Sequence, residues 1–187
     1  MPSRTAPAVA NGVVAMVVFI ATEVMFFAGL VSAFIIVKAG AMAWPPPGQP
    51  RLPVAATAFN TAVLLASGVV LWVAGRAWRR NDARDRARRL LGQALALGTF
   101  FVLLQGFEWV RLIGFGLTMK SSAYGAFFYL IVGSHALHAV AAIVALGALT
   151  VQYGRGGVSA SALAATQLFW YFVVGVWPIL YVLVYLS

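Results

Sequence analysis

Three ionisable side chains lie in the middle of long apolar stretches of this sequence, and they are its first candidates for chemistry. Glu23 interrupts the first stretch, and His135 and His138 lie near the middle of the fourth. An ionised group at bilayer depth is costly unless it is paired or hydrated, so each is a candidate site. Glu23 is either a proton-binding or lipid-contacting carboxyl, or a structural carboxyl that is protonated or hydrogen-bonded to a neighbouring helix.

The spacing of three residues places His135 and His138 on one helix face, an arrangement that suggests a haem or metal site. The supply of ligands argues against one, because the chain has no third histidine and no cysteine. A carboxylate-bridged dimetal bundle needs more acidic groups than Glu23 and Glu108 provide. We therefore expect no metal or cofactor in this chain and two histidines hydrogen-bonded across a helix interface. His135 and His138 lie at similar depth to Glu23, because the first and fourth spans are antiparallel, so a contact between Glu23 and the histidines is possible.

The other intramembrane polar residues have simpler interpretations. Glu108 precedes Arg111 by one helical turn, which predicts an intrahelical ion pair near the interface. Gln105 offers hydrogen bonds to neighbouring helices, as do Asn60, Gln93 and Gln167. The predicted polar intramembrane cluster consists of His135, His138, Glu108 and Gln105.

Composition identifies the elements that must position these groups. The 187 residues are 63% hydrophobic and 9% charged, against roughly 45 to 50% and 25% in a soluble domain. Disorder and a disulfide scaffold are excluded, and the bilayer is the solvent that fits. We predict an all-α polytopic membrane protein, a single domain over 1–187 with five spans. The expected spans are residues 13–37, 52–76, 90–114, 123–153 and 162–187.

The distribution of charge predicts orientation. Seven arginines lie between the second and third spans, from Arg76 to Arg89, so that loop is expected in the cytoplasm. The N-terminus is then cytoplasmic and the C-terminus periplasmic. The net charge of +9 lies mostly in this loop, which favours topogenic and lipid-facing charge over nucleic-acid binding. On the other side, the proline-rich segment 44–48 is expected to be a stiff, extended strap.

Short motifs along the chain resemble one family. Residues 21–29 read A-T-E-V-M-F-F-A-G and resemble the S/T-E-x-x-F-F-x-G signature of subunit III of the haem-copper respiratory oxidases, the cytochrome c and quinol oxidases. Further similar motifs follow in order: W-P-P at 44–46, N-T-A-V-L-L-A-S-G at 60–68, L-Q-G-F-E-W at 104–109, S-A-Y-G-A-F-F at 122–128, G-S-H-A-L-H at 133–138, and Trp170 with Trp177. The resemblance covers nearly the whole chain.

The chain departs from the family pattern in its last span. The family usually has W-H-F-V-D-x-V-W there, whereas this chain has Tyr171 and Val174 at the His and Asp positions. Any role that those two groups share with His135 and His138 is therefore in doubt. The chain also begins where the third helix of the seven-helix members would begin, so it looks like a five-helix short form.

The resemblance implies an accessory, cofactor-free subunit of an oxidase that couples oxygen reduction to proton translocation. Haem and copper would belong to subunits I and II. Subunit III would pack on subunit I in the bacterial inner membrane, hold phospholipid, and sustain proton uptake and turnover stability. Glu23 corresponds to the family's buried, carbodiimide-reactive glutamate.

Two other functions stay open on the residues alone. The same fold is similar to subunit III-like partners of nitric oxide reductases and supercomplexes. Glu23 with His135 and His138 would also suit a proton channel or transporter, although residues 13–21 contain no proton carrier. The electron donor, cytochrome c or quinol, is determined by other chains.

Overall fold

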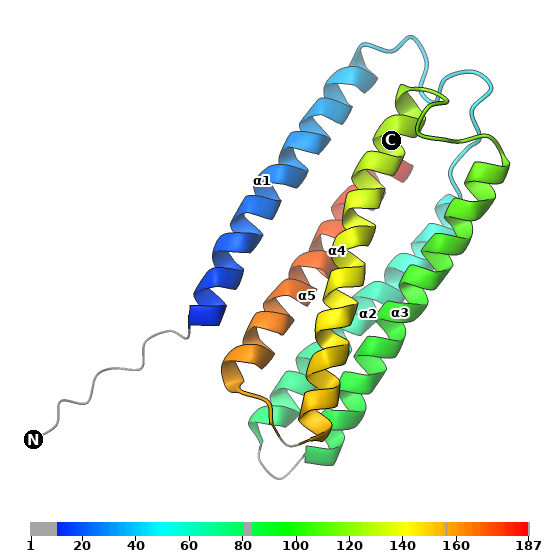
Figure 1. Ribbon diagram of the computed structural model, residues 1–187. Coiled ribbons are helices and arrows are strands. Elements are labelled where there is room, and N and C mark those ends of the chain that lie inside the picture. The colour runs from blue at the N-terminus through cyan, green and yellow to red at the C-terminus, as the bar shows by residue number, and fades with distance from the viewer. Residues whose placement is uncertain (1–10, 81–83, 156, 187) are drawn as a thin grey trace, which may run out of the picture.

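The structure, a computed structural model, describes residues 11–80, 84–155 and 157–186. Within these ranges the chain forms helices and no strands, and five helices are long and apolar enough to cross a membrane. This confirms the predicted all-α polytopic class. In chain order the helices are α1 (Asn11–Ala39), α2 (Val54–Arg79), α3 (Arg84–Gly114), α4 (Ala123–Gly154) and α5 (Ala160–Leu180), followed by the π-helical turn η1 (Tyr181–Tyr185) (Figure 1).

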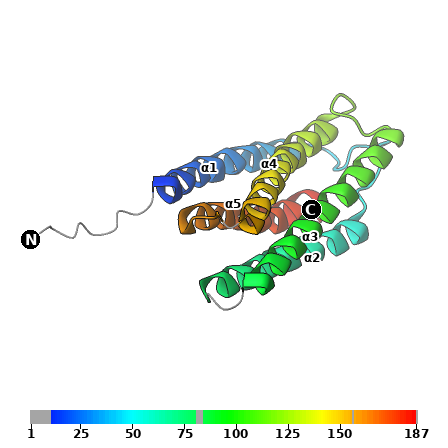
Figure 2. The same cartoon turned by 60° about the horizontal axis from the view of Figure 1, so that its bottom comes forward.

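The helices pack in three layers. α2 and α3 form one flank as an antiparallel pair, α4 and α5 lie in the middle, and α1 lies on the opposite flank (Figures 1 and 2). α1 packs against α5 and α4, which are its neighbours in space although they are last in the sequence. Glu23 and the two histidines are therefore carried by adjacent helices.

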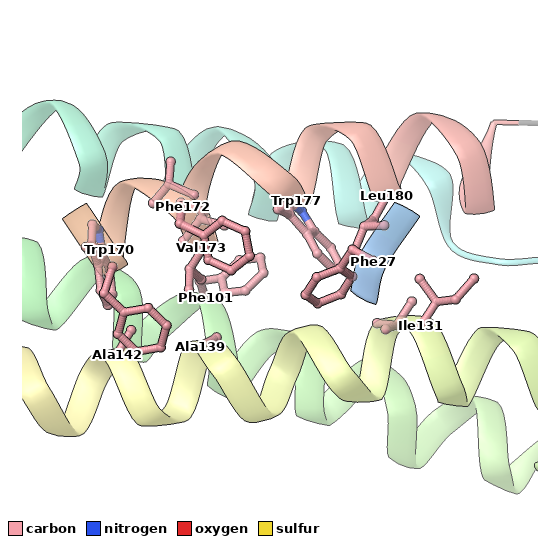
Figure 3. Close-up of a cluster of buried hydrophobic side chains, with 14 of the residues drawn as sticks. Phe27, Phe101, Ile131, Ala139, Ala142, Trp170, Phe172, Val173, Trp177 and Leu180 are labelled. Carbon is pink, nitrogen blue, oxygen red and sulfur yellow. The ribbon is translucent and has the colours of Figure 1, made fainter. Parts of the chain in front are cut away.

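Aromatic side chains of α5 form the centre of the bundle. Trp170 and Trp177 are fully buried, and Phe101 of α3 lies between them in the same core (Figure 3). The phenyl ring of Phe101 meets the Trp177 indole edge to face at 5.1 Å. Gly98 admits Trp170, because a Cβ at position 98 would collide with the six-membered part of that indole. α5 is consequently buried on several faces, as a central helix must be.

The arginine-rich connection is mostly helical, which corrects its prediction as a loop. α2 continues to Arg79, so Arg76 and Arg79 lie in its last turn, where cations favour the negative end of the helix dipole. α3 begins at Arg84 rather than near residue 90, with Asp85 in its first turn. Both helices extend beyond the apolar stretch because arginine is a good helix former, a property that hydropathy does not register.

The proline-rich segment bends, which corrects the expectation of an extended strap. Residues 42–45 form successive bends, and the amide N–H of Gln49 donates to the Pro46 carbonyl at 3.2 Å in a turn. Gly48 has a φ of +83°, in the left-handed region that glycine tolerates. The segment therefore folds down over the end of the bundle.

The fifth span also differs at its end. Regular α-helix stops at Leu180, shortly after Pro178, and a π turn follows. Proline has no N–H, so residue 178 cannot donate the backbone hydrogen bond that an α-helix would form there. The turn directs Val184 and Tyr185 into the core, where both are buried.

Candidate functional site

The carboxyl of Glu23 on α1 meets the imidazole of His138 on α4. Glu23 Oε2 lies 3.0 Å from His138 Nε2. The side chains are 18% and 14% exposed, so the protein shields them without enclosing them completely. Glu23 and both histidines were expected at similar depth, and the structure brings Glu23 into contact with His138.

The contact of the second ring nitrogen of His138 determines which atoms of the Glu23–His138 pair carry protons. His138 Nδ1 lies 2.7 Å from the carbonyl oxygen of Ser134 one turn earlier. A carbonyl only accepts, so Nδ1 carries a proton and Nε2 of the neutral ring is an acceptor. The 3.0 Å contact then needs one further proton, bound either to Glu23 or to Nε2. In either arrangement the pair has no net charge, which lowers the cost of placing it within a bilayer.

Aromatic rings surround His138. The Phe27 ring lies 5.5 Å from the imidazole centroid, and the rings of Phe172, Phe169 and Phe19 lie at 6.3, 6.4 and 6.5 Å. Phe27 and Phe172 belong to the buried core (Figure 3). These rings exclude water and keep the proton between two defined partners.

His135 differs from His138, which corrects part of the prediction for the histidines. His135 is 1% exposed, and its ring lies 4.8 Å from the Trp177 indole and 6.4 Å from Phe101. Its Nε2 has no hydrogen-bond partner among the described residues. Of the two histidines, His138 is therefore the one whose Nε2 makes the expected bond across a helix interface.

Gln105 belongs to a separate polar network. Its Oε1 accepts a hydrogen bond from Asn60 Nδ2 at 3.2 Å, and its Nε2 donates to the Tyr185 hydroxyl at 2.9 Å. Asn60 also donates to the Phe101 carbonyl at 3.1 Å. The network joins α2, α3 and η1, and Asn60, Gln105 and Tyr185 are all buried. Buried amides need such partners, so this network specifies how the three elements pack.

Glu108 is paired within its own helix. Arg111 Nη1 lies 3.3 Å from Glu108 Oε1, one turn along α3, as the spacing predicted. The Glu108 side chain is 15% exposed and the Arg111 side chain is 51% exposed. The four residues expected in one polar cluster thus lie in different surroundings: His138 with Glu23, His135 among aromatic rings, Gln105 in its amide network, and Glu108 with Arg111.

Two contacts between α5 and α2 were not foreseen from the sequence. Trp177 Nε1 donates to Thr61 Oγ1 at 2.8 Å, and Trp170 Nε1 donates to Ser67 Oγ at 3.2 Å. The two hydroxyl residues on α2 are six positions apart, and the two tryptophans on α5 are seven apart, so the donors and acceptors have nearly the same spacing on the two helices. This similar spacing is the feature of the sequence that could have indicated the two hydrogen bonds.

The substituted position 174 also lies at this interface. Val174 is buried, and its methyl group would lie 3.1 Å from a Cβ at Gly68 of α2. An aspartate there would place its carboxyl against α2, whereas valine gives an apolar contact. Tyr171, at the other substituted position, is only partly buried.

In the described part of the chain, no three His, Asp or Glu side chains come together. Glu23 and His138 are two ligands from two helices. The groups present therefore suit proton binding and packing.

Comparison with known proteins gives one consistent relationship. Residues 3–187 match the family model described as cytochrome c oxidase subunit III. The probable cytochrome c oxidase subunit 3 of Mycobacterium leprae (strain TN) is 36% identical over 176 residues, covering 92% of this chain and 86% of that protein. That of Nocardia farcinica (strain IFM 10152) is 33% identical with the same coverage, and the cytochrome c oxidase subunit 3 of Synechocystis sp. is 30% identical, covering 91% and 73%.

Proposed function

The chain belongs to the cytochrome c oxidase subunit III family, and from that premise we propose that it stabilises subunit I and supports proton uptake through Glu23 and His138. It is an accessory subunit of an oxidoreductase complex whose catalytic centre lies in subunit I. It is also a multi-pass membrane protein that assembles with other oxidase subunits. The names of its relatives favour cytochrome c as electron donor, and they favour an oxidase over a nitric oxide reductase or an independent channel.

The 3.0 Å contact between Glu23 and His138 is the observation that carries the proposed proton role. The pair holds one mobile proton between α1 and α4 and remains neutral overall. A group of this kind can accept a proton without creating an isolated charge in the bilayer. In the proposed role, the Glu23–His138 pair keeps a bound proton beside the proton-uptake route of subunit I. The pair also holds α1 and α4 together there.

The outer faces of the bundle support the proposed direct partners, subunit I and phospholipid. α1 buries only Phe27 and Phe34, and its remaining surface is largely apolar and exposed. α3 likewise exposes Leu103, Phe107 and Val110. Faces of this chemistry suit acyl chains and the apolar helices of another subunit. We place the complex in a bacterial inner membrane, with haem and copper bound by the partner subunits.

Purification of the complex through an affinity tag on this chain tests the proposal. We expect subunit I to be recovered together with the absorption spectrum of its haems, and the isolated chain to be colourless. A colourless preparation from which subunit I is missing would contradict the function. A haem that stays with the isolated chain would contradict the cofactor-free assignment.

A further inference from the structure

A cavity of about 160 Å³ lies between α3, α4 and α5. Gln105 and Trp109 of α3 line one side of it, Val132 and His135 of α4 line another, and Trp177 of α5 also contributes. The function proposed above rests on Glu23 and His138 and gives this cavity no role. Most of the lining residues are apolar, so the few polar atoms there determine which ligand the cavity accepts.

Two residues in this wall each carry a buried nitrogen atom that has no hydrogen-bond partner in the described part of the chain. The atoms are His135 Nε2 and Trp109 Nε1. The indole N–H of Trp109 can only donate, whereas Nε2 of a neutral imidazole either donates or accepts. Leaving such groups unpaired inside a protein is unfavourable. The two atoms therefore require a ligand that accepts a hydrogen bond from Trp109 and also bonds to His135.

The edge of the Trp109 indole that carries Nε1 faces α4. Cη2 lies on the same edge of the ring system as Nε1, and it would be 3.5 Å from a Cβ at Gly133 of α4. Val132 and Ala136, which flank Gly133 on α4, both line the cavity. The buried Nε1 therefore lies on the side of α3 that borders the cavity.

The His135 imidazole is held by two rings that also line the cavity. It lies 4.8 Å from the Trp177 indole, with 32° between the ring planes, and 6.4 Å from the Phe101 ring, at 85°. The Trp177 N–H is already bonded to Thr61, and Phe101 has no polar side-chain atom. A partner for His135 Nε2 therefore has to come from the cavity itself.

Gln105 supplies a third polar group in the same wall, one helical turn before Trp109. Its Oε1 accepts one hydrogen bond from Asn60, and its Nε2 donates one to Tyr185. A carboxamide oxygen has two lone pairs and the nitrogen has two protons, so each atom of Gln105 retains capacity for a further bond. Trp109, Gln105 and His135 together provide the roughly two to four polar partners that a buried water molecule needs.

We propose that this cavity holds ordered water that bridges Trp109 and His135. Trp109 Nε1 donates to a water oxygen, and the water donates to His135 Nε2, which leaves the neutral imidazole with its proton on Nδ1. The cavity of about 160 Å³ has room for this, because a water molecule occupies about 30 Å³ in the liquid. Through Gln105 the water connects α4 to the hydrogen-bond network of α2, α3 and η1.

The two nitrogen atoms favour water over a hydrocarbon chain. An acyl chain would fit the apolar part of the wall, but it offers no acceptor to an N–H group. Ordered water between membrane-spanning helices satisfies polar groups of this kind. Trp109 lies in the last two turns of α3, so water can enter from the nearby membrane interface.

Solid-state NMR of the full chain in lipid bilayers, with ¹⁵N-labelled tryptophan and histidine, tests the site. Magnetisation is transferred to the labelled groups either from water protons or from acyl-chain protons. We expect the Trp109 N–H to receive water magnetisation several-fold faster than the N–H groups of Trp177 and Trp170, which are bonded to hydroxyls of α2. The ¹⁵N spectrum of His135 should show a neutral ring without a proton on Nε2. Loss of one indole signal in Trp109→Phe assigns that signal.

A variant that fills the cavity provides the second measurement. Ala136→Leu adds a larger side chain to the α4 wall, so transfer from water to Trp109 should fall to the level of Trp177. Ala141→Leu is the matched control, because Ala141 is exposed on the same helix and does not line the cavity, and it should leave the transfer unchanged.

Three results would overturn the proposal. In the wild type, which needs no variant to fold, transfer from water to Trp109 could be as slow as transfer to Trp177. Transfer to Trp109 from acyl-chain protons instead of water would assign the cavity to hydrocarbon. A His135 ring that carries a proton on Nε2 would exclude the bridge as described. None of these results depends on the proposed role of Glu23.

Discussion

Trp177 and Thr61 join the last helix of the bundle to the second through a 2.8 Å hydrogen bond from indole Nε1 to the threonine hydroxyl. Thr61 in turn donates to the Thr57 carbonyl of its own helix at 2.7 Å. The Thr61 hydroxyl thus both donates and accepts a hydrogen bond inside a bundle where little water is present. Trp170 and Ser67 repeat the arrangement along the same interface. Hydrogen bonds of this kind define the register of α5 on α2.

Removing the Trp177–Thr61 hydrogen bond should destabilise the fold. The effects of changing the two residues should not be additive, because the residues share this bond. We expect Thr61→Val, which keeps the volume, to cost about 1 kcal/mol, and Trp177→Phe to cost more because it also reduces a fully buried ring. The double variant should be less destabilised than the sum, with a coupling of about 0.6 kcal/mol. Unfolding by sodium dodecyl sulfate in mixed micelles measures these free energies. Strict additivity of the two changes would contradict the bond.

Enlarging Gly98 should disturb the central helix. A methyl group there would collide with the Trp170 indole, so we expect Gly98→Ala to destabilise the protein by roughly 1–3 kcal/mol. Gly92→Ala is the matched control, because that position on the same helix faces open space. The midpoint of thermal unfolding in detergent measures both. A Gly98→Ala variant as stable as Gly92→Ala would show that Trp170 is not packed as described.

Replacing Glu23 should separate the structural and protonic roles of the pair. In Glu23→Gln an amide N–H can still donate to His138 Nε2, but the exchangeable proton is lost. We therefore expect an intact complex with an unchanged haem spectrum that inactivates after fewer turnovers. Counting turnovers before inactivation at constant oxygen supply gives the result.

Glu23→Ala and Glu108→Gln complete that comparison. Glu23→Ala leaves the largely shielded His138 Nε2 without its partner and should also lower stability, by about 1 kcal/mol. Glu108→Gln changes only the partly exposed pair with Arg111 and should behave as wild type. The same turnover count for Glu23→Gln and Glu108→Gln would refute a protonic role for Glu23.

Orientation in the membrane is accessible because the chain contains no cysteine. We expect Lys120→Cys to react with a membrane-impermeant maleimide in intact spheroplasts, and Arg86→Cys to react only after permeabilisation. Both positions are exposed: Arg86 lies in the first turn of α3, and Lys120 lies in the connection between α3 and α4 at its other end. The arginines around Arg86 should hold that end in the cytoplasm. The reverse labelling pattern would invert the predicted topology.

Features that depend on periodicity and depth could be predicted from the sequence. Five apolar stretches predicted five helices, and the similar depth of Glu23 and the two histidines predicted a possible contact, which the structure shows for His138. The spacing of Glu108 and Arg111 predicted their ion pair. Each of these depends on distance along one helix or across a bilayer of known thickness, which the sequence contains directly.

Features that depend on how irregular segments fold could not be predicted. Gln105 bonds to Tyr185 because a π turn after Pro178 directs that tyrosine inward, and no hydropathy pattern signals such a turn. Likewise, the bent path of residues 42–45 brings Trp44 against Tyr124. The start of α3 was predicted near residue 90, but it lies at Arg84, because arginines extend the helix beyond the apolar stretch.

The neighbours of α1 have a consequence for biosynthesis. During translation α1 leaves the ribosome before α4 and α5, against which it packs. Until the fourth span arrives, the Glu23 carboxyl has no imidazole beside it, so it must wait in protonated form or near the headgroups. The α2–α3 hairpin can form in this interval without α1. Docking of α1 is therefore a late step in the assembly of these helices, because it must follow the synthesis of α4 and α5.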